Sequence, residues 1–194
     1  DGTWSDPGNI DQQTGTFDPT QAQIGSNTLT YTYGTGTCLK TDTRSVYVDP
    51  VPAVTAGPDV TVCQQADPIS LTSGSPLGGY WQGPGVDSAG NIIPQNMNVG
   101  TFDLAYTYVS NLSICQNTDT LVLTVEAPPA VDVGPAVEYG NSNQNITFSG
   151  YTPAGGLWNG PGIIDGINGV FNTQTAGGVG AYQVVYTYTN NFGC

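Results

Sequence analysis

The sequence predicts an all-β fold made of small modules that repeat along the chain. Trp4, Trp81 and Trp158 recur at a constant spacing of 77 positions, and each opens a similar phrase that ends in Pro-Gly. Threonine, tyrosine and valine alternate with polar residues, whereas helix formers are scarce. The 27 glycines and 14 prolines recur at similar offsets and so indicate turns. Self-similarity at a fixed period indicates an array of one structural unit.

Proline-rich segments at 49–53 and 126–130 mark the expected joints between modules. Proline interrupts strand pairing and stiffens a short link. We therefore expect 1–49 to be the C-terminal part of a module without its first strands. Residues 50–127 are expected to form a complete module, and 128–194 a module lacking its last strand. Each module is then expected to contact the neighbouring modules of the same chain.

Strands of the complete module follow from alternation of apolar and polar residues with a period of two. A tight turn, Gly83-Pro84-Gly85, closes the third strand. Short alternating strands with frequent turns predict an immunoglobulin-like β-sandwich, and the repeat predicts tandem modules arranged end to end. In chain order the expected strands are 60–62, 69–71, 80–82, a short edge strand at 92–93, 101–109 and 120–125.

Charge and composition exclude several classes of function. Only Lys40 and Arg44 are basic, against 15 acidic residues, and the net charge is −13. Nucleic acid and anionic membrane surfaces are therefore not expected partners. No apolar run is long enough to insert into a bilayer. The chain has no histidine, which removes the usual general base and the Ser-His and Cys-His nucleophile pairs. We expect a protein that is not an enzyme.

The four cysteines suggest a disulfide in the complete module. A bridge between Cys63 and Cys115 would close a long loop and contribute about 3–4 kcal/mol on the chain-entropy model. Two free thiols are the alternative. Cys38 stands one repeat period before Cys115, while Cys194 has the same place in the third module. The position one period after Cys63 holds Gly140, so we expect Cys194 to be free or bonded outside this sequence.

The combined motif resembles a known repeat class. It reads Gly-Gly-x-Trp-x-Gly-Pro-Gly, then Gly-x-Phe, then Tyr-Thr-Tyr and a cysteine, then a threonine-rich strand. This is similar to the tandem immunoglobulin/PKD-like repeats of giant surface adhesins of gliding, Bacteroidetes-type bacteria. The resemblance covers essentially the whole chain and departs from the pattern at Asp6 and Gly140. It implies export by the type IX route, display on the outer membrane and a role in surface adhesion and gliding motility.

Two short motifs fit the same origin. Asp87-Ser88-Ala89 and Asp119-Thr120-Leu121 resemble the Asp-Ser/Thr-aliphatic acceptor for O-glycans in these bacteria. Ser88 and Thr120 are therefore candidate O-glycosylation sites, and a chance match is the alternative for each.

Two kinds of binding site compete with structural roles for the same residues. Trp4, Trp81 and Trp158 could stack on sugar rings, but their recurrence beside a tight turn favours a role in the core of each repeat. Acidic residues near the joints are candidate ligands for calcium between modules, although no Asp-x-Asp-x-Asp loop is present and no cofactor is required. These weak calcium candidates are Asp49, Asp59, Glu126 and Asp132.

Three further acids, Asp11, Asp87 and Asp165, follow the tryptophan phrases. Aspartate side chains in turns accept hydrogen bonds from nearby backbone N–H groups. We therefore expect these three acids to cap turns.

The function expected from these features is structural and adhesive. Serial sandwich modules would form a stiff, acidic stalk of a very large extracellular surface protein. Its adhesive target would be a surface polysaccharide or another ligand, and an exposed sheet edge could join copies into a filament. The alternative is a set of carbohydrate-binding accessory modules of a secreted polysaccharide-degrading enzyme.

Overall fold

The computed structural model describes residues 2–6, 10–111 and 115–194. Within these residues strands dominate, and helix is limited to two short 3₁₀ turns and the four-residue helix α1 (Thr173–Ala176). The all-β prediction is confirmed. Strand ends coincide with glycine- and proline-rich turns, as the composition indicated.

The N-terminal residues form a three-stranded sheet in the order β1-β2-β3. Its strands are β1 (Thr3–Ser5), β2 (Gly25–Tyr33) and β3 (Lys40–Val48). β2 and β3 pair antiparallel along nine residues, from Gly25↔Val48 to Tyr33↔Lys40. β3 therefore lies at one edge of this sheet. Leu29, on β2, is buried.

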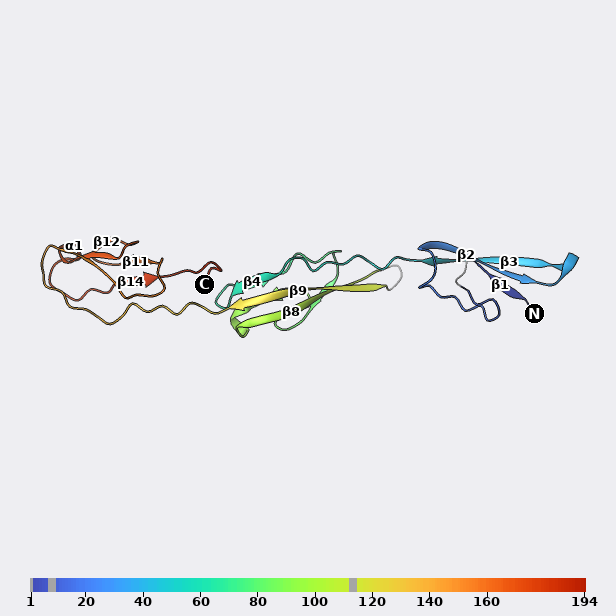
Figure 1. The fold of residues 1–194 in the computed structure, drawn as a ribbon, viewed down its shortest axis with the longest axis horizontal. Helices are drawn as coiled ribbons and strands as arrows, with labels where there is room; N and C mark the ends of the chain where they lie inside the picture. The colour runs from blue at the N-terminus through green and yellow to red at the C-terminus, as the bar shows by residue number, and fades with distance from the viewer. Residues whose placement is uncertain (1, 7–9, 112–114) are drawn as a thin grey trace. The chain divides into compact units, whose positions relative to one another are not determined.

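Residues 60–126 contain a four-stranded sheet in the order β4-β9-β8-β6 and a two-stranded sheet, β5-β7. Figure 1 shows β8 and β9 as long arrows with β4 beside them. Each expected strand is found near its predicted place, and β9 begins four residues earlier than expected. The strands are β4 (Val60–Cys63), β5 (Ile69–Ser70), β6 (Tyr80–Gln82), β7 (Asn91–Ile92), β8 (Gly100–Val109) and β9 (Gln116–Glu126).

The core of this region consists of alternate residues on the longest strands. Leu121, Leu123 and Val125 on β9 are at most 1% exposed, while the residues between them are half-buried. Leu104 on β8 and Ile92 on β7 are fully buried. Buried and more exposed side chains therefore alternate along β9, as the period-two pattern of a strand requires.

Residues 145–187 form two small sheets, in the orders β10-β13-β12 and β11-β14. Aromatic rings fill their interior: Phe148 and Tyr151 both contact Trp158, with ring centroids 4.6 and 5.3 Å away. The strands are β10 (Asn145–Thr147), β11 (Leu157–Asn159), β12 (Ile163–Asp165), β13 (Val170–Asn172) and β14 (Val185–Thr187).

The chain divides into two compact units, and their limits do not follow the predicted module boundaries. One unit comprises residues 1–56, 73–80 and 106–119, and the other comprises 57–72, 81–105 and 120–194. β8 and β9 contribute residues to both units. The division into modules 1–49, 50–127 and 128–194 stays a prediction.

Candidate functional site

Each tryptophan lies on a short strand, and two of them pair with the tyrosine at the corresponding position of the repeat. Trp4 pairs with Tyr31 across β1 and β2, and Trp158 pairs with Tyr186 across β11 and β14. The ring centroids are 5.0 and 4.9 Å apart, with interplanar angles of 49° and 43°. Aromatic pairs at this separation are favourable beyond the area they bury. The same local arrangement of tryptophan and tyrosine thus occurs twice, in two regions far apart in the sequence.

A glycine with positive φ lies against each indole ring. At each of these positions a β-carbon would approach the ring to 2.9 Å or less, so only glycine permits the contact. The three pairs are Gly15 (φ 74°) with Trp4, Gly90 (φ 89°) with Trp81, and Gly169 (φ 65°) with Trp158.

An aspartate caps the turn that carries each of these glycines. Asp11 accepts hydrogen bonds from the backbone N–H groups of Gln13 and Thr14, at 3.0 and 2.6 Å. Asp165 accepts from the same two relative positions, and Asp87 accepts from the N–H groups two and four residues on, all at 2.9–3.0 Å. The prediction that these three acids cap turns is confirmed.

These hydrogen bonds lower the pKa of all three carboxyl groups. For Asp87 the hydrogen bond from the Asn91 side chain contributes most, and for Asp165 that from the Asn168 side chain. For Asp11 the largest cause of the lowered pKa is the backbone N–H of Thr14. Hydrogen bonds to the ionised form favour that form, which explains the common direction.

In two of the Tyr-Thr-Tyr motifs, the hydroxyl of the first tyrosine makes hydrogen bonds to the backbone of the segment that precedes the tryptophan. Tyr106 Oη donates to the carbonyl of Pro76 at 2.6 Å and accepts from the N–H of Gly79 at 2.9 Å. Tyr186 makes the same two bonds, to Pro153 at 2.6 Å and from Gly156 at 2.7 Å. The sequence analysis identified Tyr-Thr-Tyr as part of the repeated motif and did not predict this bridge. The Gly-Gly pair before Trp81 and before Trp158 was the available signal, because a β-carbon at Gly79 would collide with the Tyr106 ring.

Trp81 and Trp158 are buried, with exposed fractions of 4% and 5%. Trp4 is half-buried. A sugar ring needs an open aromatic face on which to stack, and two of the three indoles do not offer one. We call each tryptophan with its glycine and aspartate a tryptophan turn; the three tryptophan turns are built on Trp4, Trp81 and Trp158.

The predicted Cys63–Cys115 disulfide is wrong. The structure bonds Cys63 to Cys194 instead, with a Cα–Cα distance of 5.2 Å, inside the usual range for disulfides. Cys63 is in register with Glu126 at the end of β9, whereas Cys115 directly precedes the first residue of that strand. At about 3.3 Å per residue the two cysteines are about 35 Å apart, too far to bridge.

Cys38 and Cys115 are free thiols in the structure; Cys38 is exposed and Cys115 half-buried. Both outcomes expected for Cys194, a free thiol or a bond outside this sequence, are also corrected by its bond to Cys63. Sequence spacing paired Cys63 with Cys115 because both lie in the predicted complete module. Spacing could not show that the two residues lie near opposite ends of β9.

The four calcium candidates have different local roles. Asp59 Oδ1 accepts from the N–H of Val122 at 2.8 Å, and Asp132 Oδ1 accepts from the N–H of Gly134 at 2.8 Å. Asp49 and Glu126 are both half-buried. Among the residues that the structure describes, no three acidic or cysteine side chains gather closely enough to hold a metal ion. The calcium site stays a prediction without a described ligand set.

Both candidate glycosylation sites are accessible. Ser88 is exposed in the turn capped by Asp87, and Thr120 is exposed on β9 between the half-buried Asp119 and the buried Leu121. The acid of each motif is already engaged: Asp87 within its turn, and Asp119 through a 3.0 Å hydrogen bond from the N–H of Ala56. Exposure permits attachment of a glycan, and occupancy stays a prediction.

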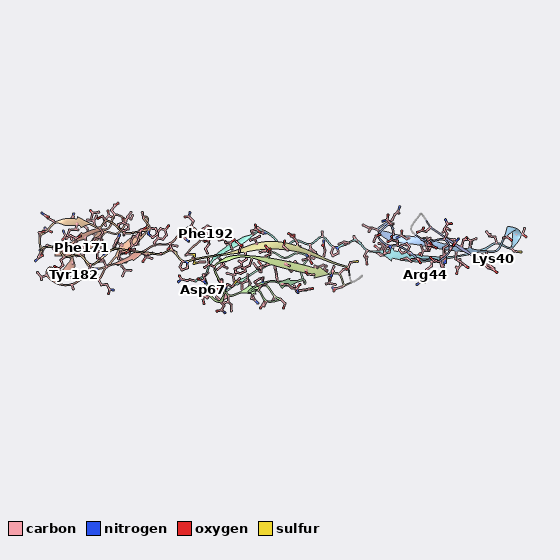
Figure 2. The ribbon with its side chains drawn as sticks, turned by 60° about the horizontal axis from the view of Figure 1, so that its bottom comes forward. Lys40, Arg44, Asp67, Phe171, Tyr182 and Phe192 are labelled. Atoms are coloured by element: carbon pink, nitrogen blue, oxygen red, sulfur yellow. A yellow bond between two sulfur atoms is a disulfide. The ribbon has the colours of Figure 1, made fainter. Side chains whose placement is uncertain are left out.

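The two basic residues of the chain share one strand. Lys40 and Arg44 both lie on β3, and both are exposed (Figure 2). No helix in the described ranges is long and apolar enough to cross a membrane. Comparison of the chain with known protein families and with curated proteins finds no match. Local geometry is therefore the basis on which a function can be proposed.

Proposed function

We propose that this chain is a stretch of tandem immunoglobulin-like modules from the stalk of a large secreted bacterial surface adhesin. The observation that carries the proposal is the recurrence of the tryptophan turn at a constant spacing, each time with a positive-φ glycine and a capping aspartate. An enzyme needs one unique constellation of reactive groups, whereas a load-bearing array needs one stable unit repeated many times.

The arrangement of strands in residues 60–126 supports the immunoglobulin-like part of the proposal. In immunoglobulin-like domains one sheet contains strands C, F and G, and a tryptophan on strand C is buried. Here β6, β8 and β9 are neighbours in one sheet and Trp81 on β6 is 4% exposed. β5 and β7 form a separate two-stranded sheet in the same region, which supports the proposed sandwich.

Burial of the tryptophans also favours the stalk over the carbohydrate-binding alternative. Carbohydrate-binding accessory modules present aromatic faces to solvent, and Trp81 and Trp158 are inside. The disulfide favours an oxidising environment such as the cell exterior. Surface display, export by the type IX route and a link to gliding motility follow from the sequence resemblance and belong to the proposal.

Two observations test the proposed function. The complete open reading frame should contain many further units of the same period, and antibodies against this chain should label filaments on intact cells and reduce attachment to surfaces. A polysaccharide-degrading domain in the same reading frame, together with binding to a glycan array by the purified chain, would instead establish the accessory-module alternative. Glycan binding is expected to stay at background for both the wild-type chain and Trp4→Ala.

A further inference from the structure

One face of the sheet β1-β2-β3 is a regular array of threonine and serine side chains. Residues that lie directly opposite each other on antiparallel strands share a face, so the strand registers define rows across the sheet. We call the eight residues of this array the hydroxyl face. Its first row is Thr3, Thr32 and Thr41, its second row is Ser5, Thr30 and Thr43, and its third row is Thr28 and Ser45.

The opposite face of the same sheet carries the aromatic and charged residues. The rings of Trp4 and Tyr31 contact each other there, and Leu29 is buried there. The register places Asp42 opposite Tyr31 and Arg44 opposite Leu29, on that face as well. The hydroxyl face is therefore uncharged, although the net charge of the chain is −13.

The hydroxyl face is open to water. Six of its eight side chains are exposed, and Thr30 and Thr32 are half-buried. The corresponding face of the sheet β4-β9-β8-β6 also points away from its core, because Thr118 and Thr120 on β9 are exposed while Leu121 is buried. The core of each region thus covers the other face of its sheet.

The protein does not use these hydroxyl groups internally. In the sheet β4-β9-β8-β6, the hydroxyls of Thr107 and Thr118 are hydrogen-bonded to each other at 2.9 Å. The hydroxyls of the hydroxyl face make no hydrogen bond with another residue in the described part of the chain. Each of them can therefore bind a molecule from outside.

The hydroxyl face has two regular spacings. Opposite residues on neighbouring strands are about 4.8 Å apart, and alternate residues along one strand are about 6.7 Å apart. Water molecules on the prism faces of hexagonal ice repeat in two perpendicular directions at nearly these intervals, the shorter slightly smaller and the longer slightly larger. A threonine hydroxyl can take the place of one such water molecule, whereas a charged side chain orders water in a way that ice does not continue.

We propose that the hydroxyl face binds the surface of ice crystals and slows their growth. Neighbouring strands twist relative to each other, so the match with a flat crystal face is best at the centre of the array, at Thr30 and Thr43. The methyl groups of the threonines add apolar contact beside each hydroxyl. This function would be additional to the proposed stalk and does not depend on it.

The corresponding face of residues 60–126 lacks the array and provides an internal control. Tyr80 and Gln82 stand one repeat period after Thr3 and Ser5. Counted from the Tyr-Thr-Tyr motif, the places of Thr28 and Thr30 hold an aspartate and an alanine, at 103 and 105. Thr120, one repeat period after Thr43, is thus an exposed threonine outside any hydroxyl array.

The test compares the same substitution at these two equivalent threonines. The purified chain is mixed with a carrier protein that does not bind ice, the solution is partly frozen on a slowly cooled surface, and the ratio of chain to carrier in the ice is measured. Wild type and Thr120→Tyr should be enriched in the ice. Thr43→Tyr should lose about tenfold of this enrichment, as when a residue at the centre of a contact is replaced.

A second substitution and a second surface make the result decisive. Thr41→Tyr, also at an exposed position of the hydroxyl face, should lose the enrichment as well while its thermal unfolding matches that of Thr120→Tyr. A wild-type chain that is excluded from ice as the carrier is would overturn the proposal. Equal enrichment of Thr43→Tyr and Thr120→Tyr would overturn it too, as would retention of the wild-type chain on crystalline cellulose or chitin in place of ice.

Discussion

At the scale of single residues, the tryptophan turn depends on a glycine that no other residue can replace without strain. A β-carbon at Gly90 would lie 2.8 Å from Trp81 Cδ1 and 2.9 Å from the carbonyl oxygen of Leu71. The backbone there also has a φ of 89°, which residues with side chains rarely adopt. Substitution of Gly90 therefore has two separate costs: an unfavourable backbone conformation and a steric collision.

These two costs can be separated by experiment. Gly90→Ala should lower the free energy of unfolding by about 2–4 kcal/mol, because it adds a collision to an unfavourable φ. Gly78 has a similar φ of 93° and no atom within 4 Å of the added carbon, so Gly78→Ala should cost only about 1 kcal/mol. Urea titrations of both variants measure the difference. Equal losses would show that the contact with the indole has no steric consequence.

The capping aspartates predict a specific dependence on pH. The pKa of Asp87 is lowered from 3.8 by hydrogen bonds, so its contribution to stability is present above that value. The contribution is lost as pH falls through the lower pKa of the folded state. Thermal unfolding of wild type should therefore shift to lower temperature below about pH 4.

A non-titrating replacement isolates this carboxyl group. Asp87→Asn retains an acceptor oxygen for the two backbone N–H groups, so its melting temperature should fall less on acidification than that of wild type. Asp67→Asn is the matched control, since Asp67 is an exposed acid in the same compact unit (Figure 2). An acid-induced shift that is the same in both variants would contradict the role assigned to Asp87.

At the scale of elements, side-chain hydrogen bonds connect strands in addition to the backbone hydrogen bonds of the sheets. Tyr106 on β8 is hydrogen-bonded to the chain that leads into β6, through Pro76 and Gly79. The same bridge recurs at Tyr186, which indicates that it belongs to the design of the unit. It fixes where the tryptophan strand begins.

Removal of one hydroxyl tests this bridge. Tyr106→Phe should destabilise the chain by about 1–3 kcal/mol, because it leaves a carbonyl and an N–H without their partner. Tyr108→Phe is the control, since Tyr108 is half-buried and its hydroxyl makes no hydrogen bond with a described residue. Chemical denaturation compares the two variants. A loss for Tyr108→Phe as large as for Tyr106→Phe would show that the bridge contributes nothing.

The elements that could be predicted from the sequence are those with a local signal. Alternation of apolar residues located β4, β6, β8 and β9, and the aspartates after each tryptophan phrase identified the capped turns. The parallel pairing of β4 with β9 has no such signal, because it joins residues far apart in the sequence, as in Val60↔Leu123. The error at Cys63 and Cys115 has this cause, since only the pairing shows that Cys63 on β4 lies beside the last residue of β9, whereas Cys115 precedes the first.

At the scale of the whole molecule, the disulfide changes the path along which tension travels. The bond between Cys63 and Cys194 spans 131 residues of sequence. A pull on the two ends of the chain therefore passes through the sulfur atoms, and the residues between the cysteines carry no load. An array of the proposed kind would gain a covalent limit to its extension.

Stretching single molecules in oxidising and reducing buffer measures this limit. At about 3.3–3.6 Å per residue, reduction should lengthen the fully extended chain by about 450 Å. Cys63→Ser should show the longer extension in both buffers, and Cys38→Ser, which changes a free thiol, should respond to reduction as wild type does. No change in extension on reduction would contradict the observed pairing.

The central proposal is that small β units, each with its own tryptophan turn and its own core, carry mechanical load in series. The most direct measurement is the number of unfolding steps when the reduced chain is pulled from its two ends. Separate cores predict at least two resolved steps, each releasing only part of the total length. A single step that releases the entire chain at once, or extension without any resisting step, would contradict the account.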